Sequence, residues 1–276
     1  MAALAALALR RAANRIGRVS ALAAAGVVTV AALALASDAS AQHSLIISRI
    51  KPSIVAIGTF QATRVPQFRF AGTGFAVGDG TFAATNAHVI PTTLDGGADP
   101  EQLVAVLPAS DASGPAIRRL SRVLVDIEHD LALLRMDGAA LRPMKVRDSS
   151  SIAEGDELLF TGFPIGSVIG LFPATHRALV AAIAPVALPS ASGRQLDPKV
   201  VRRLRDSAFP IFQLDATAFP GNSGSPLYDP ANGEVVGVVN MVFVKGTREA
   251  ALSHPSGISY AMPSRYLLEL LGKVRP

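Results

Sequence analysis

Residues 215–226, Asp-Ala-Thr-Ala-Phe-Pro-Gly-Asn-Ser-Gly-Ser-Pro, place Ser223 in a tight turn that is rich in glycine and proline. Residues 235–240, Val-Val-Gly-Val-Val-Asn, follow shortly after and are typical of a short buried strand. Glycine allows backbone conformations that other residues avoid, so the turn can bend sharply around the serine. Taken alone, this segment is equally consistent with a simple connection between two strands.

Two other segments place polar residues beside predicted strands. Residues 85–89, Thr-Asn-Ala-His-Val, contain His88 after an apolar run, and residues 128–134, Glu-His-Asp-Leu-Ala-Leu-Leu, put Asp130 directly before one. A single histidine in such a place is more often structural, and an aspartate before a strand commonly caps a turn. Taken together with Ser223, however, the three segments have the order His, Asp, Ser.

This order fits nucleophilic catalysis by a serine. A serine hydroxyl is a weak nucleophile at neutral pH and needs a neighbouring base, which His88 would supply. Asp130 would orient the imidazole and stabilise its protonated form. The backbone amides of Gly221 and Ser223 would bind the oxyanion. The order differs from those of α/β-hydrolases and subtilisins.

The rest of the chain is rich in short apolar or β-branched runs separated by turn residues, which predicts an all-β sandwich or barrel. The predicted strands are Ile54–Phe60, Gly72–Val77, Leu103–Leu107, Arg122–Ile127, Leu131–Arg135, Glu157–Phe163, Ala178–Ile183, Ile211–Leu214, Val235–Val239 and Ile258–Ala261. Two helices are expected in addition. One covers Lys199–Asp206, and the other covers Arg265–Lys273 with Ser264 as its cap.

These motifs are similar to those of trypsin-like serine peptidases, and most similar to the HtrA/Deg branch. The similarity extends over nearly the whole chain after residue 41, in 72–75, 85–88, 130–134, 161–166, 215–224, 236–240 and 258–264. The resemblance implies a chymotrypsin-like double β-barrel, with barrels at roughly 50–147 and 148–263 and a C-terminal helix at 264–274. It also implies His88 and Asp130 on the first barrel and Ser223 on the second. A homo-oligomer would be compatible with it.

Several residues depart from the family pattern. Asn222 stands where trypsin has an acid that pairs with a newly freed N-terminus, so activation by such a cleavage is not expected. Ser225 resembles the glutamyl endopeptidases, but Asn240 stands near the place of the histidine with which those enzymes recognise a carboxylate. The sequence stops at Pro276 without a PDZ domain, so the peptide-gated regulation of the family is not carried over.

The substrate pocket is expected to include Thr217, Phe219 and Asn240. The neighbouring segments 216–219 and 239–242 contain no charged residue. Because an uncharged pocket cannot compensate a buried charge, small or medium aliphatic residues are expected before the scissile bond.

The first 41 residues resemble a secretory signal peptide. Four arginines precede an uncharged run, Ala21–Ala36, and Ala39-Ser40-Ala41 fits a cleavage site. The run is shorter than the roughly 20 apolar residues of a membrane-spanning helix, although an uncleaved anchor is the alternative. The expected mature domain is 42–276, secreted or periplasmic in a bacterium.

Composition excludes several classes of function. The chain has 276 residues and no cysteine, so disulfides, thiolate nucleophiles and iron–sulfur clusters are excluded. Removal of residues 1–41 lowers the formal charge from +5 to +2, so a basic nucleic-acid surface is not supported. No metal or cofactor motif is present, and His129 is expected to be a surface turn residue. The expected partners are protein or peptide substrates.

The sequence therefore predicts an exported serine endopeptidase that acts on unfolded proteins through an acyl-enzyme. Two alternatives remain open. One is a binding or chaperone module that keeps this fold with little turnover, and the other is an esterase with the same three residues.

Overall fold

The computed structural model describes residues 42–108, 115–166, 170–185, 209–240 and 257–274. The chain divides into two units, Met1–Leu45 and Ile46–Pro276, and the second contains all the strands discussed below. The expected signal peptide (1–41) and the helix expected at 199–206 lie outside the described residues.

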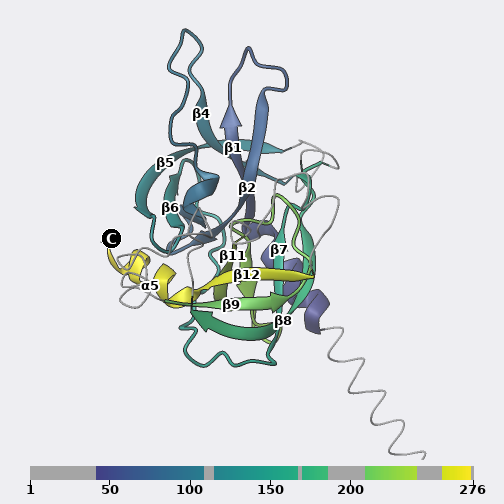
Figure 1. Cartoon of the computed structure of the whole chain (residues 1–276). Coiled ribbons are helices and arrows are strands. Elements are labelled where there is room, and N and C mark those ends of the chain that lie inside the picture. Colours follow the sequence, from purple (N-terminus) through teal and green to yellow (C-terminus); the bar gives the residue numbers. More distant parts are fainter. Residues whose placement is uncertain (1–41, 109–114, 167–169, 186–208, 241–256, 275–276) are drawn as a thin grey trace, which may run out of the picture. The chain divides into compact units, whose positions relative to one another are not determined.

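The first half of the second unit forms a closed antiparallel barrel with the strand order β1-β2-β3-β6-β5-β4 (Figure 1). Its strands are β1 (Ile54–Phe60), β2 (Phe68–Val77), β3 (Phe82–Thr85), β4 (Gln102–Leu107), β5 (Ala116–Asp126) and β6 (Leu131–Met136). Two single-turn 3-10 helices, η1 (Lys51–Ser53) and η2 (Ala87–Val89), precede β1 and follow β3.

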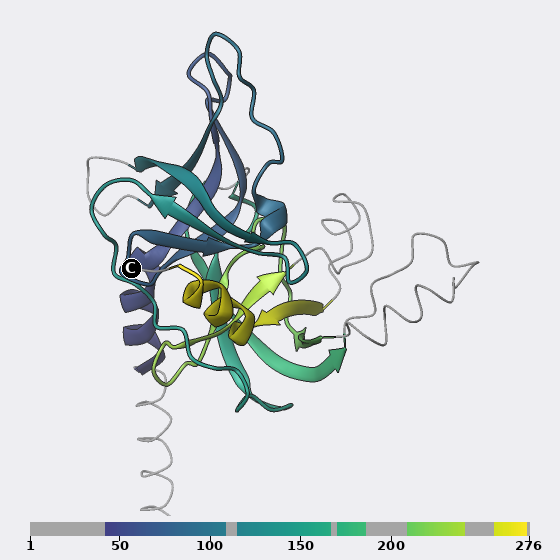
Figure 2. The ribbon, with the colours of Figure 1, turned by 90° about the vertical axis from the view of Figure 1, so that its left-hand side faces the viewer.

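The second half closes a second antiparallel barrel with the order β10-β11-β12-β9-β8-β7. Its strands are drawn in green to yellow in Figure 2. Its strands are β7 (Glu157–Gly162), β8 (Ala174–Pro185), β9 (Pro210–Asp215), β10 (Pro226–Tyr228), β11 (Val235–Asn240) and β12 (Ile258–Pro263). Two six-stranded antiparallel barrels followed by a short C-terminal helix are the chymotrypsin-like fold, and the expectation of fold class is confirmed.

The sequence of β1 is largely apolar without alternation, because both of its faces are buried. Val55 and Ile57 lie in the core of the first barrel, whereas Ile54 and Ala56 lie in a second core shared with residues of β7, β11 and α5. Since both faces of the strand are buried, every position favours an apolar side chain. The second barrel has an interior cluster of its own, centred on residues such as Phe160.

The C-terminal helix α5 (Ser264–Gly272) contacts β6 of the first barrel and β11 and β12 of the second. Tyr266, Leu267 and Leu270 are buried on its inner face. The prediction that Ser264 caps this helix is wrong, because its hydroxyl makes no capping bond and instead donates to the carbonyl of Arg147. This carbonyl belongs to the segment between the barrels, so the serine joins the helix to that segment.

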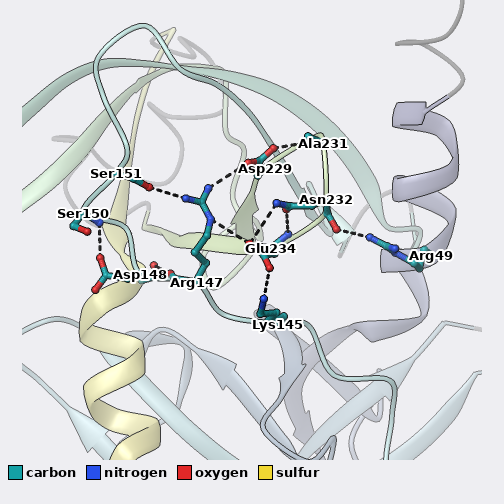
Figure 3. A network of polar contacts seen from close by, with 11 residues as sticks. Arg49, Lys145, Arg147, Asp148, Ser150, Ser151, Asp229, Ala231, Asn232 and Glu234 are labelled. Carbon is teal, nitrogen blue, oxygen red and sulfur yellow. Dashed lines mark hydrogen bonds and ion pairs between the residues drawn. The ribbon is translucent and has the colours of Figure 1, made fainter.

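The segment between the barrels is held by a network of charges (Figure 3). The Arg147 guanidinium lies 3.2 Å from Asp229 and 3.3 Å from Glu234, and Lys145 Nζ lies 2.5 Å from the other oxygen of Glu234. The backbones are joined as well. The N–H of Arg147 donates to the carbonyl of Val235, and the N–H of Val235 donates to the carbonyl of Lys145. The segment is thereby fixed along the start of β11.

Candidate active site

His88 and Asp130 meet at one end of the first barrel. His88 lies in η2 after β3, and Asp130 lies in the turn between β5 and β6. The ring Nδ1 of His88 is 2.6 Å from Asp130 Oδ2, and the backbone N–H of His88 donates to Asp130 Oδ1 at 2.9 Å. The His88 side chain is 31% exposed and that of Asp130 is 18% exposed. The carboxylate therefore orients an imidazole that keeps access to solvent.

Asp130 has an unusual backbone conformation, with φ at +50°. Aspartate tolerates this left-handed region better than most residues, because its short polar side chain can form local hydrogen bonds. Its carbonyl accepts the backbone N–H of Ala87 at 3.1 Å and the side-chain amide of Asn86 at 3.0 Å. These bonds tie the turn that carries the carboxylate to the segment that carries His88.

Asn240, at the end of β11, also binds Asp130. Its fully buried amide donates to Asp130 Oδ2 at 2.7 Å, over a separation of 110 residues. Asn240 is predicted from the sequence to line the substrate pocket, and no local pattern indicates its contact with Asp130. The contact brings a strand of the second barrel onto the carboxylate of the first.

Ser223 lies in the turn between β9 and β10 and is 6% exposed. The turn depends on Gly221 at φ +103° and Gly224 at φ +86°. A Cβ at Gly224 would overlap the carbonyl oxygen of Thr73, and one at Gly221 would overlap that of Phe163. The glycines flanking the serine are therefore required both by conformation and by the close approach of neighbouring backbone.

Thr73 in β2 attaches this turn to the first barrel. Its backbone N–H donates to the carbonyl of Ser223 at 2.8 Å, and its hydroxyl donates to the carbonyl of Gly221 at 2.7 Å. A Cβ at the neighbouring Gly72 would meet both the side chain of Val89, the residue after His88, and the carbonyl oxygen of Ser223. The structure thus brings the serine turn beside the histidine segment, although no hydrogen bond joins the Ser223 hydroxyl to His88 among the described residues.

The backbone amides of Gly221 and Ser223 have no hydrogen-bond partner within the described part of the chain. The carbonyl of Pro220, in the same turn, accepts the N–H of Ile165 at 2.9 Å. Neither N–H group is therefore used in a hydrogen bond within the described residues.

The predicted pocket residues Thr217 and Phe219 are both half-buried. Their segment is held by Ser259 of β12, whose hydroxyl donates to the carbonyl of Ala216 at 2.6 Å and accepts the N–H of Ala218 at 3.1 Å. Phe219 lies near the ring of His176, at 6.5 Å between centroids. Ser259 is a further residue that the sequence analysis did not assign to the pocket.

Neither a metal-binding group nor a membrane-spanning helix is found in the described ranges. They contain no group of three or more histidine or acidic side chains that could hold a metal ion. Within the same ranges, no helix has both the length and the apolar character needed to cross a membrane.

Known structures with this fold include HtrA-type proteases. A serine endoprotease from Yersinia pestis superimposes with a TM-score of 0.56 and 22% identity, over 84% of this chain and 65% of the other. The HtrA-type protease AlgW, solved with a decapeptide, has a TM-score of 0.58 and 22% identity, over 83% of this chain and 66% of the other. At this level of identity the similarity establishes the fold.

Sequence relatives indicate the same family. Proteins named as probable periplasmic serine endoproteases, DegP-like, are 32% identical over 205 residues in Pseudomonas putida and 31% identical over 217 residues in Pseudomonas savastanoi. The matches cover 74% and 79% of this chain but only 36% and 38% of those relatives. Residues 72–238 match the model of the trypsin-like peptidase domain. The chain therefore belongs to the trypsin-like peptidase family, with HtrA/DegP-like serine endoproteases among its relatives.

Proposed function

We propose that this protein is a serine endopeptidase with Ser223 as nucleophile, His88 as general base and acid, and Asp130 as the residue that orients His88. The observation that carries the proposal is the 2.6 Å contact between His88 Nδ1 and Asp130, with Asn240 on the same carboxylate oxygen. A donor–acceptor contact at Nδ1 leaves Nε2 as the nitrogen that can accept the serine proton. The serine turn lies beside the histidine segment through Gly72 and Thr73.

In the first half of the reaction, Ser223 Oγ attacks the carbonyl carbon of the scissile peptide bond while His88 Nε2 takes the hydroxyl proton. The carbonyl oxygen becomes an oxyanion, which the free N–H groups of Gly221 and Ser223 bind. The C–N bond then breaks, and His88 returns the proton to the leaving amine. An acyl-enzyme ester on Ser223 remains.

In the second half, a water molecule attacks the ester carbonyl and gives its proton to His88. The same two N–H groups bind the second oxyanion. Collapse of this intermediate breaks the bond to Ser223 Oγ, and His88 returns the proton to the serine. Loss of one oxyanion donor in other serine peptidases costs about 10²–10³ in kcat, so these amides make a large contribution.

The proposed substrates are unfolded proteins outside the cytoplasm. Relatives named as periplasmic serine endoproteases support this location, and so does a segment at 1–41 with the composition of a signal peptide. N-terminal sequencing of the exported protein is expected to give Gln42. A start at Met1 would instead favour the retained anchor.

The pocket at Thr217 and Phe219 is proposed to accept small or medium aliphatic side chains before the scissile bond. The absence of charge from residues 216–219 supports this preference. Cleavage of an unbiased peptide library would test it, and a preference for glutamate or for basic residues would contradict it.

The decisive experiment is labelling of residues 42–276 with a fluorophosphonate, alongside Ser223→Ala, His88→Ala and a control, Ser150→Ala. We expect labelling and casein hydrolysis that require Ser223 and His88 but not Ser150. Hydrolysis of small esters without cleavage of proteins would favour the esterase. Folded protein that neither takes up the label nor cleaves casein would favour the binding module.

A further inference from the structure

His129, the residue directly before Asp130, is not the surface turn residue that the sequence suggested. It does lie in the turn between β5 and β6, but its side chain is only 16% exposed. The backbone N–H of His129 donates to Asp126 Oδ1 at 3.1 Å, and its ring Nδ1 lies 2.8 Å from Asp126 Oδ2. One aspartate at the end of β5 thus holds both the backbone and the ring of the residue that leads into Asp130.

The other side of the His129 ring contacts two aromatic residues. It stacks on Tyr266 of α5, with centroids 3.9 Å apart and planes at 15°, and lies 4.6 Å from the ring of Phe209. Phe209 and Tyr266 also contact each other, edge to face at 5.7 Å. These rings come from the first barrel, from the residue before β9 in the second, and from the C-terminal helix.

We propose that His129 and Tyr266 are positioning residues for Asp130. This inference rests on the proposed function, because it assigns importance to the placement of the Asp130 carboxylate. Asp130 has a left-handed backbone, which persists only when the surroundings determine it from several sides. Asn86 and Ala87 hold its carbonyl on the side of η2, whereas the clamp of Asp126, His129 and Tyr266 holds the peptide that precedes it.

The clamp also links this position to both barrels. His88 and Asp130 belong to the first barrel and Ser223 to the second, so their relative placement depends on contacts between the two. The stacking of His129 on Tyr266 is such a contact, and it involves the residue that directly precedes Asp130. Docking of α5 against the β5–β6 turn is therefore a condition for a correctly placed carboxylate.

Neither His129 nor Tyr266 is proposed to touch substrate, so their loss should lower kcat and leave KM unchanged. His129→Asn keeps a hydrogen-bonding side chain for Asp126 but removes the stacked ring, and Tyr266→Leu removes the ring from the other side. We expect each to lower kcat about tenfold, the rate equivalent of one lost aromatic pair. The conservative variant Tyr266→Phe keeps the ring and is expected to retain kcat within about twofold.

The matched control is Asp79→Asn, which alters a turn carboxylate that binds Thr81 at the opposite end of β3 from η2. It should leave kcat unchanged. Rates are normalised to the fraction of protein that a fluorophosphonate titrates, so partly unfolded variants do not count as slow ones. The double variant His129→Asn/Tyr266→Leu should be no slower than the slower single variant, because each substitution already removes the stacking of His129 on Tyr266.

Three results would overturn the inference: unchanged kcat in both single variants, multiplicative losses in the double variant, or a Tyr266→Phe variant as slow as Tyr266→Leu. Failure of the proposed function has a different signature. In that case the wild type would show no hydrolysis, or hydrolysis would persist in Ser223→Ala. A proton resonance from the His88 Nδ1–H bond to Asp130, weakened in His129→Asn but not in Asp79→Asn, would provide support independent of turnover.

Discussion

At the scale of single residues, the serine turn depends on glycines that no other residue can replace. Gly224 has φ at +86°, and a Cβ there would overlap the carbonyl oxygen of Thr73 and the hydroxyl of Thr85. Gly155 offers a matched comparison, because its φ is +95° and a Cβ there would meet nothing within 4 Å. Alanine at Gly155 would therefore suffer only the strain of a positive φ, whereas alanine at Gly224 would suffer this strain and steric overlap as well.

Gly155→Ala should lower the free energy of unfolding by about 1–2 kcal/mol, the cost of a left-handed backbone for alanine. Gly224→Ala should lower it by about 1–3 kcal/mol more, because the Thr73 backbone must move. It should also abolish labelling of Ser223, whereas Gly155→Ala should not. Urea unfolding monitored by circular dichroism measures the free energy of unfolding of both variants. Equal losses of stability would show that the turn can relax around the added methyl group.

Asn240 is the second residue whose role can be tested alone. Its amide is the one side-chain donor from the second barrel that binds Asp130 in the described part of the chain. A hydrogen bond to a charged group contributes about 1.5–3 kcal/mol, so Asn240→Ala should lower kcat by about 10- to 100-fold.

The control for Asn240→Ala is Asn232→Ala, which also removes an amide from a carboxylate, that of Glu234, at 3.3 Å. It should leave kcat unchanged in the same peptide-hydrolysis assay. A higher KM with unchanged kcat for Asn240→Ala would instead assign this residue to the pocket, as the sequence suggested.

At the scale of elements, strand β8 carries a half-buried histidine, His176, whose ring packs against a strand of the second barrel. The ring of His176 stacks on Phe160 of β7 at 4.9 Å, and its Nε2 is buried without a hydrogen-bond partner among the described residues. Burial disfavours the charged ring and lowers the pKa of His176 below its ordinary value of 6.5.

This lowered pKa predicts acid destabilisation. Below pH 6.5 the unfolded chain binds a proton at His176 that the folded chain does not, so the free energy of unfolding falls as the pH falls. The loss continues until the pH reaches the folded-state pKa. His176→Phe keeps an aromatic ring against Phe160 and should remove this part of the dependence. Urea unfolding of both proteins between pH 7.5 and about 5 measures the difference in slope, and identical slopes would contradict the prediction.

The boundaries of several elements could be predicted from the sequence. Strand β1 and the predicted run Ile54–Phe60 coincide, and β11 and α5 lie within one residue of their predicted ends. These elements are continuous apolar or amphipathic segments bounded by turn residues. The partner of Ser264 could not be predicted, because only the tertiary structure brings the Arg147 carbonyl to its hydroxyl.

At the scale of the whole molecule, the segment between the barrels depends on Arg147. Its guanidinium binds Asp229 and Glu234, and its backbone binds Val235 and Ser264 (Figure 3). Lys145 reaches the same Glu234, but its side chain is 78% exposed. Arg147 and Lys145 therefore share Glu234 as a partner, but only the Arg147 side chain is partly buried.

Arg147→Ala should lower the free energy of unfolding by about 1.5–3 kcal/mol, because two part-buried carboxylates lose a charged donor. Lys145→Ala should lower it by less than about 1 kcal/mol, since water and salt screen an exposed pair. Thermal and urea unfolding at low and at high salt would measure both. A larger effect for Lys145→Ala would show that the network is not organised around Arg147.

The proposed chemistry of the site could be predicted from the sequence. The order of His88, Asp130 and Ser223 limits the chemistry that can be proposed, and the glycines around the serine predict a tight turn. Residue types and local spacing suffice for this, because hydrogen-bonding turns and apolar periodicity act over a few residues.

Only the tertiary structure decided which residues support the site. Asn240 binds Asp130 across 110 residues, Thr73 binds Gly221 across 148, and the ring of His129 stacks on Tyr266. None of these pairs has a local signature. Their partners are chosen when two barrels and a helix pack together, and packing depends on the shape and burial of the whole unit rather than on neighbours in the chain.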